Sequence, residues 1–420
     1  MLDLEFVRAQ FPALSQHWPD WALFDNAGGS VMAGQVAARI SDYLGRYMVQ
    51  LGASYALSQD ATAIVREAHA AAELLIGAQP GEVAIGPSTT MHAKLLAAAL
   101  RPGWREGDAI VVSELDHEAN IGPWVALAAS GIEVRTWRID PDSAELELEA
   151  LDALLDDGRV RLVCVTHCAN VVGRIQPIPA IAARVHAAGA ELCVDGVAFA
   201  PHRLVDVAAL GADYYLLSLY KLFGPHLALL WGRRALLERA AGQNHFFVGA
   251  DELPYKLEPG NANHELCAGI PGILAYLEAV DAHHHPPDGR LAGSGGAGDR
   301  RAALARGFDR FAAHEAALAE RLLDFLRNKP GVRVIGPSTG DPERRVATIA
   351  FACAGRRASE IPPLLDPAKI AVRWGHFYAI RAIEALGLGE RDGIVRVSMI
   401  HYNTAAEVDR LIAALDPLLS

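Results

Sequence analysis

Cysteine, positive charge and long apolar runs are all scarce in this sequence of 420 residues. The five cysteines are an odd number with no repeated spacing, which predicts reduced thiols and a cytoplasmic protein. Acidic residues (50) outnumber Lys and Arg (38), and the net charge of -12 argues against a nucleic-acid partner, which needs a basic surface. No run approaches the ~18–20 apolar residues of a membrane span. The residues after Met1 resemble no secretion signal.

What the chain does have is the composition of a globular protein, with 51% hydrophobic and 21% charged residues. Between residues 60 and 280, continuous apolar segments alternate with helical patterns, which predicts an α/β fold with a mainly parallel central sheet covered on both faces. The length allows more than one domain. We expect an N-terminal segment that packs with the small domain (1–30), a large domain (31–282), a flexible loop (283–300) and a small C-terminal α/β domain (301–420).

The segment 283–300 is rich in glycine, serine and proline, which predicts a mobile surface loop. Its run of His283, His284 and His285 is a possible metal site. A solvated loop is the better interpretation, because consecutive side chains on a flexible loop do not converge on one ion.

Lys221 follows an apolar run and precedes a Gly-Pro turn, and Asp195 ends another apolar run 26 residues earlier (221 − 195). A lysine for a Schiff base and an acid for the ring nitrogen are the groups that pyridoxal phosphate (PLP) needs most. Taken singly, Lys221 is typical of a solvated lysine and Asp195 of a turn residue, because most such residues lie on the surface. The residues around them favour the PLP interpretation.

Other polar residues stand where predicted strands end, the edge at which parallel sheets bind ligands. His117 can stack on the cofactor ring, although a lone histidine at a strand end is usually structural. Ser88, Thr89 and Thr90 precede a predicted helix, so their hydroxyls, the backbone N–H groups and the helix dipole suit a phosphate. The alternative for these three residues is a plain helix N-cap.

Three more residues complete the constellation. Ser218, at the strand end before Lys221, can add a hydroxyl to the phosphate site. Asn170 can donate to the 3-oxygen of the cofactor, with an ordinary turn residue as the alternative. Arg396 lies on a predicted strand, where an arginine is costly unless it is paired or at an edge, and it can capture a substrate carboxylate in a bidentate manner.

These residues belong to several different short motifs, which are spread over nearly the whole chain. They are Phe24–Gly29, Gly86–Thr90, Asp116–Trp124, Thr166–Gly173, Val194–Gly196 with Pro201 and His202, Ser218–Pro225, and Arg396–Thr404. Together they resemble the class V aminotransferase family of fold-type I PLP enzymes, and in particular its cysteine-desulfurase-like branch.

The resemblance implies PLP as cofactor, a small amino acid as substrate and a homodimer with shared active sites. Lys221 would form the Schiff base, Asp195 would contact the ring nitrogen and His117 would cover the ring. The other implied cofactor-binding residues are Ser88, Thr89, Thr90, Asn170, Ser218 and Tyr220, with Gly260 and Asn261 reaching over from a second subunit. The implied substrate-binding residues are Ala27, Gly28, Asn170, Arg373, Tyr378 and Arg396.

The chain also departs from the desulfurase pattern. Where those enzymes carry the cysteine that accepts sulfur, this chain has Tyr378, and a phenol cannot hold a persulfide. The usual glutamine three residues after the ring-nitrogen acid is Ala198, and the histidine before the lysine is Tyr220, which can still donate to a phosphate. Cys168 lies near Asn170 in sequence, and a buried bystander is its better interpretation.

The leading functional hypothesis is a PLP enzyme that deprotonates Cα of a small amino acid and then breaks a bond from the β-carbon to sulfur or another heteroatom. A class V transaminase or an amino-acid epimerase is the alternative, because the same carbanion serves all three reactions. A non-catalytic protein with a PLP-enzyme fold is a third hypothesis, against which the intact Lys221, Asp195 and His117 argue.

Overall fold

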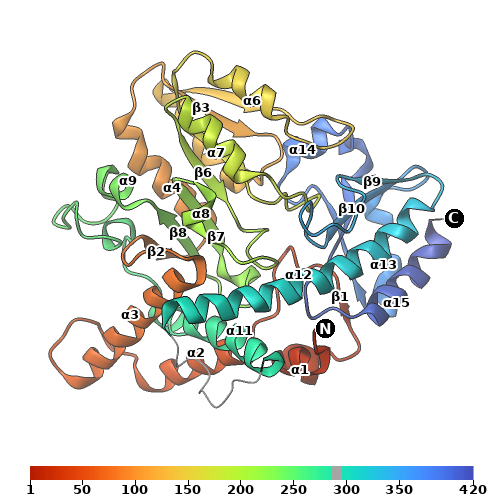
Figure 1. Ribbon diagram of the computed structural model, residues 1–420, viewed down its shortest axis with the longest axis horizontal. Helices are drawn as coiled ribbons and strands as arrows, with labels where there is room; N and C mark the ends of the chain where they lie inside the picture. The colour runs from red at the N-terminus through yellow and green to blue at the C-terminus, as the bar shows by residue number, and fades with distance from the viewer. Residues whose placement is uncertain (286–295, 420) are drawn as a thin grey trace.

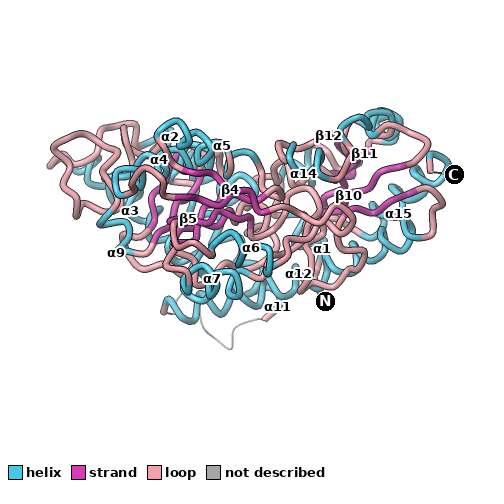
Figure 2. Tube along the Cα trace, turned by 90° about the horizontal axis from the view of Figure 1, so that it is seen from above, coloured by secondary structure: helices cyan, strands magenta, loops and turns pink. Residues whose placement is uncertain are grey.

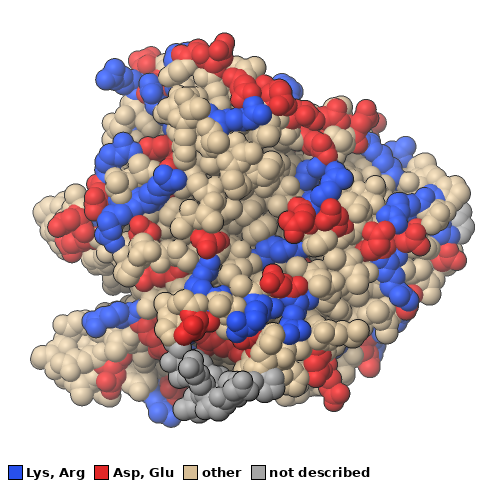
Figure 3. Space-filling model, viewed as in Figure 1, with Lys and Arg blue, Asp and Glu red and all other residues tan. Residues whose placement is uncertain are grey.

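The structure is a computed structural model that describes residues 1–285 and 296–419. Two lobes lie side by side, a larger one built on a seven-stranded sheet and a smaller one that contains the C-terminus (Figure 1). Seen at right angles, the two sheets lie at opposite ends of an elongated molecule (Figure 2). On the face shown in Figure 3, acidic and basic side chains are interspersed. None of the described helices combines the length and apolar character needed to cross a membrane.

The large sheet has the strand order β2-β8-β7-β6-β5-β3-β4 and is parallel except at β8, which runs antiparallel to both of its neighbours. The predicted α/β class is confirmed. The strands are β2 (Val83–Gly86), β3 (Ala109–Ser113), β4 (Glu133–Trp137), β5 (Val160–Thr166), β6 (Glu191–Asp195), β7 (Tyr214–Ser218) and β8 (Ala228–Gly232).

Both faces of this sheet are buried, because successive strand residues point to opposite sides. Ile85 packs into the core beneath α3, α7 and α11, whereas its neighbour Ala84 packs into the core beneath α4, α5 and α9. The helices of the large lobe are α2 (Gly34–Arg46), α3 (Ala56–Ile76), α4 (Thr89–Leu100), α5 (Gly122–Val125), α6 (Leu148–Leu155), α7 (Ile178–Ala187), α8 (Val207–Leu210), α9 (Arg234–Arg239), α10 (His264–Cys267) and α11 (Ile270–His284).

The small lobe holds an antiparallel sheet of order β12-β13-β10-β9, and the long helix α12 connects the lobes by packing on α11 and then on β9 and α15 (Figure 1). Its strands are β9 (Val332–Ile335), β10 (Thr348–Cys353), β12 (Arg373–Gly375) and β13 (Ile394–Ser398). Its helices are α12 (Ala297–Arg327), α13 (Pro362–Leu365), α14 (Ile380–Ala385) and α15 (Ala405–Leu415).

The N-terminal segment contacts both lobes. Helix α1 (Leu4–Ala9) is followed by Phe11, which packs in the core of the large lobe. Strand β1 (Ala22–Leu23) then pairs in parallel with β11 (Ile370–Ala371) of the small lobe. The chain therefore passes from one lobe to the other just before the loop that begins at Asp25.

The predicted loop 283–300 is shorter than expected at both ends. His283 and His284 are the last residues of α11, and α12 already begins at Ala297. Both histidines bind Asp3: His283 Nε2 lies 2.9 Å from its carboxylate, and His284 Nε2 accepts its backbone N–H. The remainder of the predicted loop, 286–295, lies outside the described residues.

Candidate active site

A pocket with an empty volume of about 490 Å³ opens at the carboxyl ends of the central strands. The sheet register places Thr166, Asp195 and Leu216 next to one another on β5, β6 and β7. The pocket brings together nine residues predicted to bind the cofactor, Ser88, Thr89, Thr90, His117, Asn170, Asp195, Ser218, Tyr220 and Lys221. Residues far apart in sequence thus share one site, because parallel strands end at a common edge.

Lys221 ends a short 3₁₀ turn after β7, and its side chain is buried. Its ammonium group lies 5.9 Å from the centre of the Tyr220 ring and makes no hydrogen bond or ion pair within the part of the chain that the structure describes. Burial and then the charge of Arg396 lower the pKa of Lys221 to about 8. An amine with this pKa is partly neutral at neutral pH, as a nucleophile or base requires.

Asp195 ends β6 and is also buried, and its Oδ1 accepts the backbone N–H of Val197 at 2.9 Å. Burial raises its pKa, whereas the charge of Lys221 opposes the rise. A buried carboxyl without a fixed cation is suited to receive an N–H from a bound ring.

A second buried carboxyl, Asp116, was not singled out in the sequence. It accepts hydrogen bonds from Asn120 Nδ2 at 2.7 Å, from the backbone N–H of Thr166 at 3.0 Å, and from Ser113 Oγ. Burial raises its pKa to about 8 against these three donors, with the charge of Asp195 adding to the rise. Asp116 fixes the start of the loop that carries His117.

His117 carries an imidazole whose pKa burial lowers to about 4, with Lys221 and Arg396 adding to the effect. The ring is therefore neutral at pH 7. Its Nδ1 accepts the backbone N–H of Ala119 at 3.0 Å, and the ring centre lies 5.2 Å from that of Tyr378. A neutral, half-buried ring in this position suits stacking on a flat cofactor.

Hydroxyl groups gather where α4 begins. Thr89 Oγ1 and Ser218 Oγ lie 2.6 Å apart and share one hydrogen bond. Ser88 accepts the backbone N–H of Met91 at 3.2 Å, so its side chain is an N-cap, which was the alternative interpretation of this residue. Tyr220 stacks on His226 at 4.7 Å. The free N–H groups of the helix end and the paired hydroxyls together offer donors for a phosphate.

Asn170 connects the pocket to the small lobe. Its Nδ2 donates to the backbone carbonyl of Phe377 at 2.9 Å. Its Oδ1 is buried and has no hydrogen-bond partner within the described chain. Because buried polar atoms are normally satisfied, this orphan oxygen points to a ligand group in the pocket.

Arg396 is buried on β13, and its guanidinium lies 3.8 Å from the centre of the Phe377 ring. Its Nη2 donates to Asp25 Oδ1 at 2.9 Å, and its Nη1 donates to the carbonyl of Asn170 at 3.2 Å. Arg373 Nη1 lies 3.3 Å from the other oxygen of the same carboxylate, Oδ2 of Asp25. The two arginines predicted to bind substrate therefore share one acidic partner that the sequence did not reveal.

The remaining predicted substrate residues border this pair. The N–H of Ala27 donates to Ser398 Oγ at 2.9 Å. A side chain at Gly28 would approach the carboxylate oxygens of Asp25 to within 3.1 Å. Tyr378 is 65% exposed, and it follows Phe377 in a turn where both residues have positive φ, 51° and 59°.

Gly260 and Asn261 do not line this pocket. Asn261 lines a different one, together with His69 and Glu258, whose side chains are 3.0 Å apart. Their predicted contact with a phosphate therefore needs a second subunit and stays a prediction.

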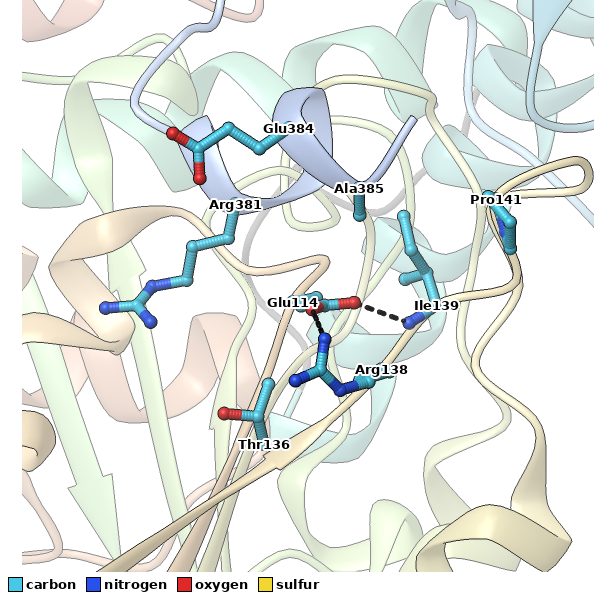
Figure 4. A pocket seen from close by; sticks show the side chains of 8 residues that line it. All are labelled: Glu114, Thr136, Arg138, Ile139, Pro141, Arg381, Glu384 and Ala385. Atoms are coloured by element: carbon cyan, nitrogen blue, oxygen red, sulfur yellow. Dashed lines mark hydrogen bonds and ion pairs between the residues drawn. The ribbon is translucent and has the colours of Figure 1, made fainter. Parts of the chain in front are cut away.

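Another hollow, between β4 and α14, is lined by Glu114, Arg138 and Arg381 (Figure 4). Glu114 there is already paired with Arg138 at 3.2 Å.

The pocket fits PLP on its own features. It offers a buried carboxyl at Asp195, a neutral ring at His117, and the amine of Lys221 and the acceptor of Asn170, neither of which has a hydrogen-bond partner among residues 1–285 and 296–419. Hydroxyls and a helix N-terminus lie among the residues that line it. A Schiff-base lysine, an acid for the ring nitrogen, a ring to stack on the cofactor and donors for the phosphate are the services that PLP requires from a protein.

Comparison with known proteins agrees with this assignment. The family model for class V aminotransferases matches residues 22–286 and 301–411. An aminotransferase-like protein of Gibberella zeae is 40% identical over 99% of this chain and 98% of its own. A cysteine desulfurase of Dickeya dadantii is 32% identical over 98% and 96%.

Solved structures show the same fold. The apo cysteine desulfurase of Thermococcus onnurineus superposes with a TM-score of 0.85 at 23% identity, covering 100% of this chain and 98% of that one. The cysteine desulfurase CsdA of Escherichia coli superposes with a TM-score of 0.80 at 26% identity, with both chains fully covered. The chain therefore belongs to the class V aminotransferase family of PLP-dependent enzymes and is similar to the cysteine desulfurases within it.

Proposed function

We propose that the enzyme removes the Cα proton of a small amino acid and then breaks a bond between the β-carbon and a heteroatom, with a C–S bond as the first candidate. The observation that carries the proposal is Lys221, a buried amine with no hydrogen-bond partner among the described residues and a pKa lowered to about 8. Such an amine can hold PLP and can also exchange a proton at Cα near neutral pH.

Each pocket residue has a role in this scheme. PLP, when bound, supplies the electron sink that stabilises negative charge at Cα. Asp195 keeps a ring N–H in place, and neutral His117 covers a ring face and excludes water. Arg396 orients the substrate through its carboxylate, so that the Cα–H bond faces Lys221.

The pocket, as the described residues form it, offers no suitable thiol for the sulfur-transfer route. Tyr378 stands in the exposed turn where the resemblance places the sulfur-accepting cysteine. Cys168 lines the pocket, but burial raises the pKa of its thiol to about 12, so it stays protonated and a poor nucleophile. We therefore propose elimination: the C–S electrons leave with sulfur, which takes up a proton and departs as sulfide. The remaining three-carbon product hydrolyses to pyruvate and ammonia.

The test is to supply the PLP-loaded enzyme with cysteine, without added thiols, and to quantify the products. Elimination predicts sulfide, pyruvate and ammonia in equal amounts over many turnovers, with no product from Lys221→Ala. Formation of alanine would contradict elimination and indicate desulfuration, whereas a pyridoxamine spectrum without sulfide would indicate transamination.

We further propose a homodimer in which a second copy contributes the loop of Gly260 and Asn261. Phe246 and Phe247, which precede this loop, are 100% and 70% exposed in the single chain, as expected of side chains that a partner covers. Asn261 has a φ of 67° and lines a pocket other than that of Lys221 in its own chain.

Co-expression of two inactive variants tests the shared site. Lys221→Ala and Asn261→Gly each impair the enzyme, but a mixed dimer regains one intact site, so about a quarter of the wild-type activity should return. Failure to regain activity in a mixed dimer confirmed by mass would contradict the shared site.

All five cysteines are free, which supports a reducing, cytoplasmic location.

A further inference from the structure

Asp25 occupies a special place between two arginines. Arg373 on β12 and Arg396 on β13 are directly opposite each other in the antiparallel pair. Like charges in this position repel each other. The carboxylate of Asp25 bridges them, with Oδ1 2.9 Å from Arg396 Nη2 and Oδ2 3.3 Å from Arg373 Nη1.

The carboxylate of Asp25 already binds one of the guanidinium N–H groups of Arg396 that a substrate carboxylate would use. A bidentate pair engages two neighbouring N–H groups of a guanidinium. On Arg396, Nη2 is bound to Asp25, whereas Nε is buried and has no partner among the described residues. The ring of Phe377 covers the flat side of the group. On the Nε–Nη2 edge, one N–H is therefore bound to Asp25 and the other has no partner among the described residues.

The surroundings allow Asp25 to move. Its side chain is 26% exposed, and Arg373 is 55% exposed, so both have room at the surface. The carboxylate lies against the backbone of Gly28, where a Cβ would come within 3.1 Å of Oδ2 of Asp25, so a larger residue at position 28 would crowd it. By contrast, Arg396 is held on β13 and by the carbonyl of Asn170.

We propose that, before substrate binds, the carboxylate of Asp25 occupies the position on Arg396 that the substrate carboxylate will take. When the substrate carboxylate binds there, Asp25 shifts onto Arg373. Asp25 is then a specificity-determining residue, since only a ligand with its own carboxylate can displace it. The proposal rests on the carboxylate role of Arg396 in the proposed function.

Two probes separate the carboxylate from the amine. 2-Methylalanine has both groups but no Cα proton, so it binds without reacting, and isopropylamine lacks the carboxylate. Binding of each to the PLP-loaded enzyme is followed by the change in the visible spectrum, which measures affinity and not activity. The variants are Asp25→Asn, Arg373→Gln, their combination, and Arg396→Gln.

The exchange predicts that Asp25→Asn lowers the Kd of 2-methylalanine by about tenfold, because a neutral amide is displaced more easily than a carboxylate. The Kd of isopropylamine should change less than about twofold, since this probe does not compete with Asp25. Arg373→Gln should raise the Kd of 2-methylalanine several-fold, because this variant removes the arginine onto which Asp25 shifts. The rise should disappear in the double variant, which also carries Asp25→Asn.

The controls keep the two proposals apart. Asp409→Asn breaks a remote surface pair with Arg321 and should leave both affinities unchanged. If Arg396→Gln fails to weaken 2-methylalanine, the carboxylate role of Arg396 in the proposed function is wrong. If Arg396→Gln weakens it but Asp25→Asn leaves the Kd unchanged or raises it, only the exchange is overturned. If Asp25→Asn does not fold, the result for Arg373→Gln decides, and an unchanged Kd in that variant overturns the exchange.

Discussion

Asn170 donates a hydrogen bond of 2.9 Å to the backbone carbonyl of Phe377, so a residue of the cofactor pocket holds a turn of the small lobe. The next carbonyl, that of Tyr378, accepts the N–H of Glu118 at 2.7 Å. Both turn residues have positive φ, which costs about 1–2 kcal/mol each for residues other than glycine. The large lobe therefore stabilises a strained turn at the mouth of its own pocket.

Replacing Asn170 by Ala should release this turn. The carbonyl of Phe377 loses its buried donor, so we expect stability to fall by about 1–2 kcal/mol and amide exchange to quicken over residues 376–379. Hydrogen exchange with mass spectrometry measures this locally. Asn328→Ala, which removes a similar but exposed bond to the Asp324 carbonyl, is the matched control and should leave the turn protected. An unchanged exchange rate in Asn170→Ala would show that Glu118 alone holds the turn.

The capture of PLP by the apoprotein should depend on pH through Lys221. Only the neutral amine reacts with an aldehyde, and its pKa is about 8. The rate should therefore rise about tenfold per pH unit below pH 8 and level off above it. Stopped-flow absorbance gives the profile. A midpoint near the ordinary lysine value would contradict the lowered pKa.

His117 should make the protein less stable in mild acid. Its pKa is about 4 in the folded state and 6.5 when unfolded, so between these values the unfolded chain binds the extra proton. Stability then falls as the pH drops through this window, by about 1–2 kcal/mol between pH 7 and pH 5 from this residue. Urea unfolding at the two pH values measures this decrease in unfolding free energy. The decrease should be smaller by that amount in His117→Phe, which keeps a ring for stacking, than in the wild type. An equal loss in both proteins would mean that His117 is solvated.

Position 378 should accept sulfur once it carries a thiol. Tyr378 is exposed, and its ring centre lies 5.2 Å from that of His117, so a cysteine there would lie at the pocket mouth. With cysteine as substrate, the thiolate introduced by Tyr378→Cys should attack the sulfur of the bound cysteine, so that the C–S bond breaks, its electrons go to the β-carbon and alanine is released. We therefore expect alanine as product and a persulfide that alkylation and mass spectrometry detect at residue 378. Tyr378→Phe is the matched variant and should show none. Steady sulfide release without a label at 378 would place the turn too far from the departing sulfur.

Much of the site could be predicted because its residues follow strands whose ends meet. Lys221 and Asp195 stand directly after apolar runs and Ser88 stands before a helix, and such local patterns are visible in a sequence. The antiparallel direction of β8 could also be inferred, since nine residues between Ser218 and Ala228 are too few for a parallel crossover.

Other features depend on contacts between distant residues. Asp25 and Arg396 are 371 positions apart in the sequence, and nothing in either motif predicts that the two side chains form a pair. Asp116 left a weak signal, because Ser113, Asp116 and Asn120 follow the apolar run of β3 at spacings of three and four residues. The two ends of the predicted loop 283–300 are helical, because α11 continues through His284 and α12 begins at Ala297, whereas the glycine- and proline-rich composition of the segment had predicted a loop there.

The most direct test of the whole account is to reduce the PLP-loaded protein with borohydride and to identify the modified peptide. The chain has five lysines, and Lys256 is the informative comparison. It too is buried, but its ammonium donates to the carbonyls of Glu238 and Ala240. We expect one pyridoxyl group on Lys221 and none on Lys256, with the visible absorption lost in Lys221→Ala. A label on another lysine, or a coloured Lys221→Ala protein, would contradict it.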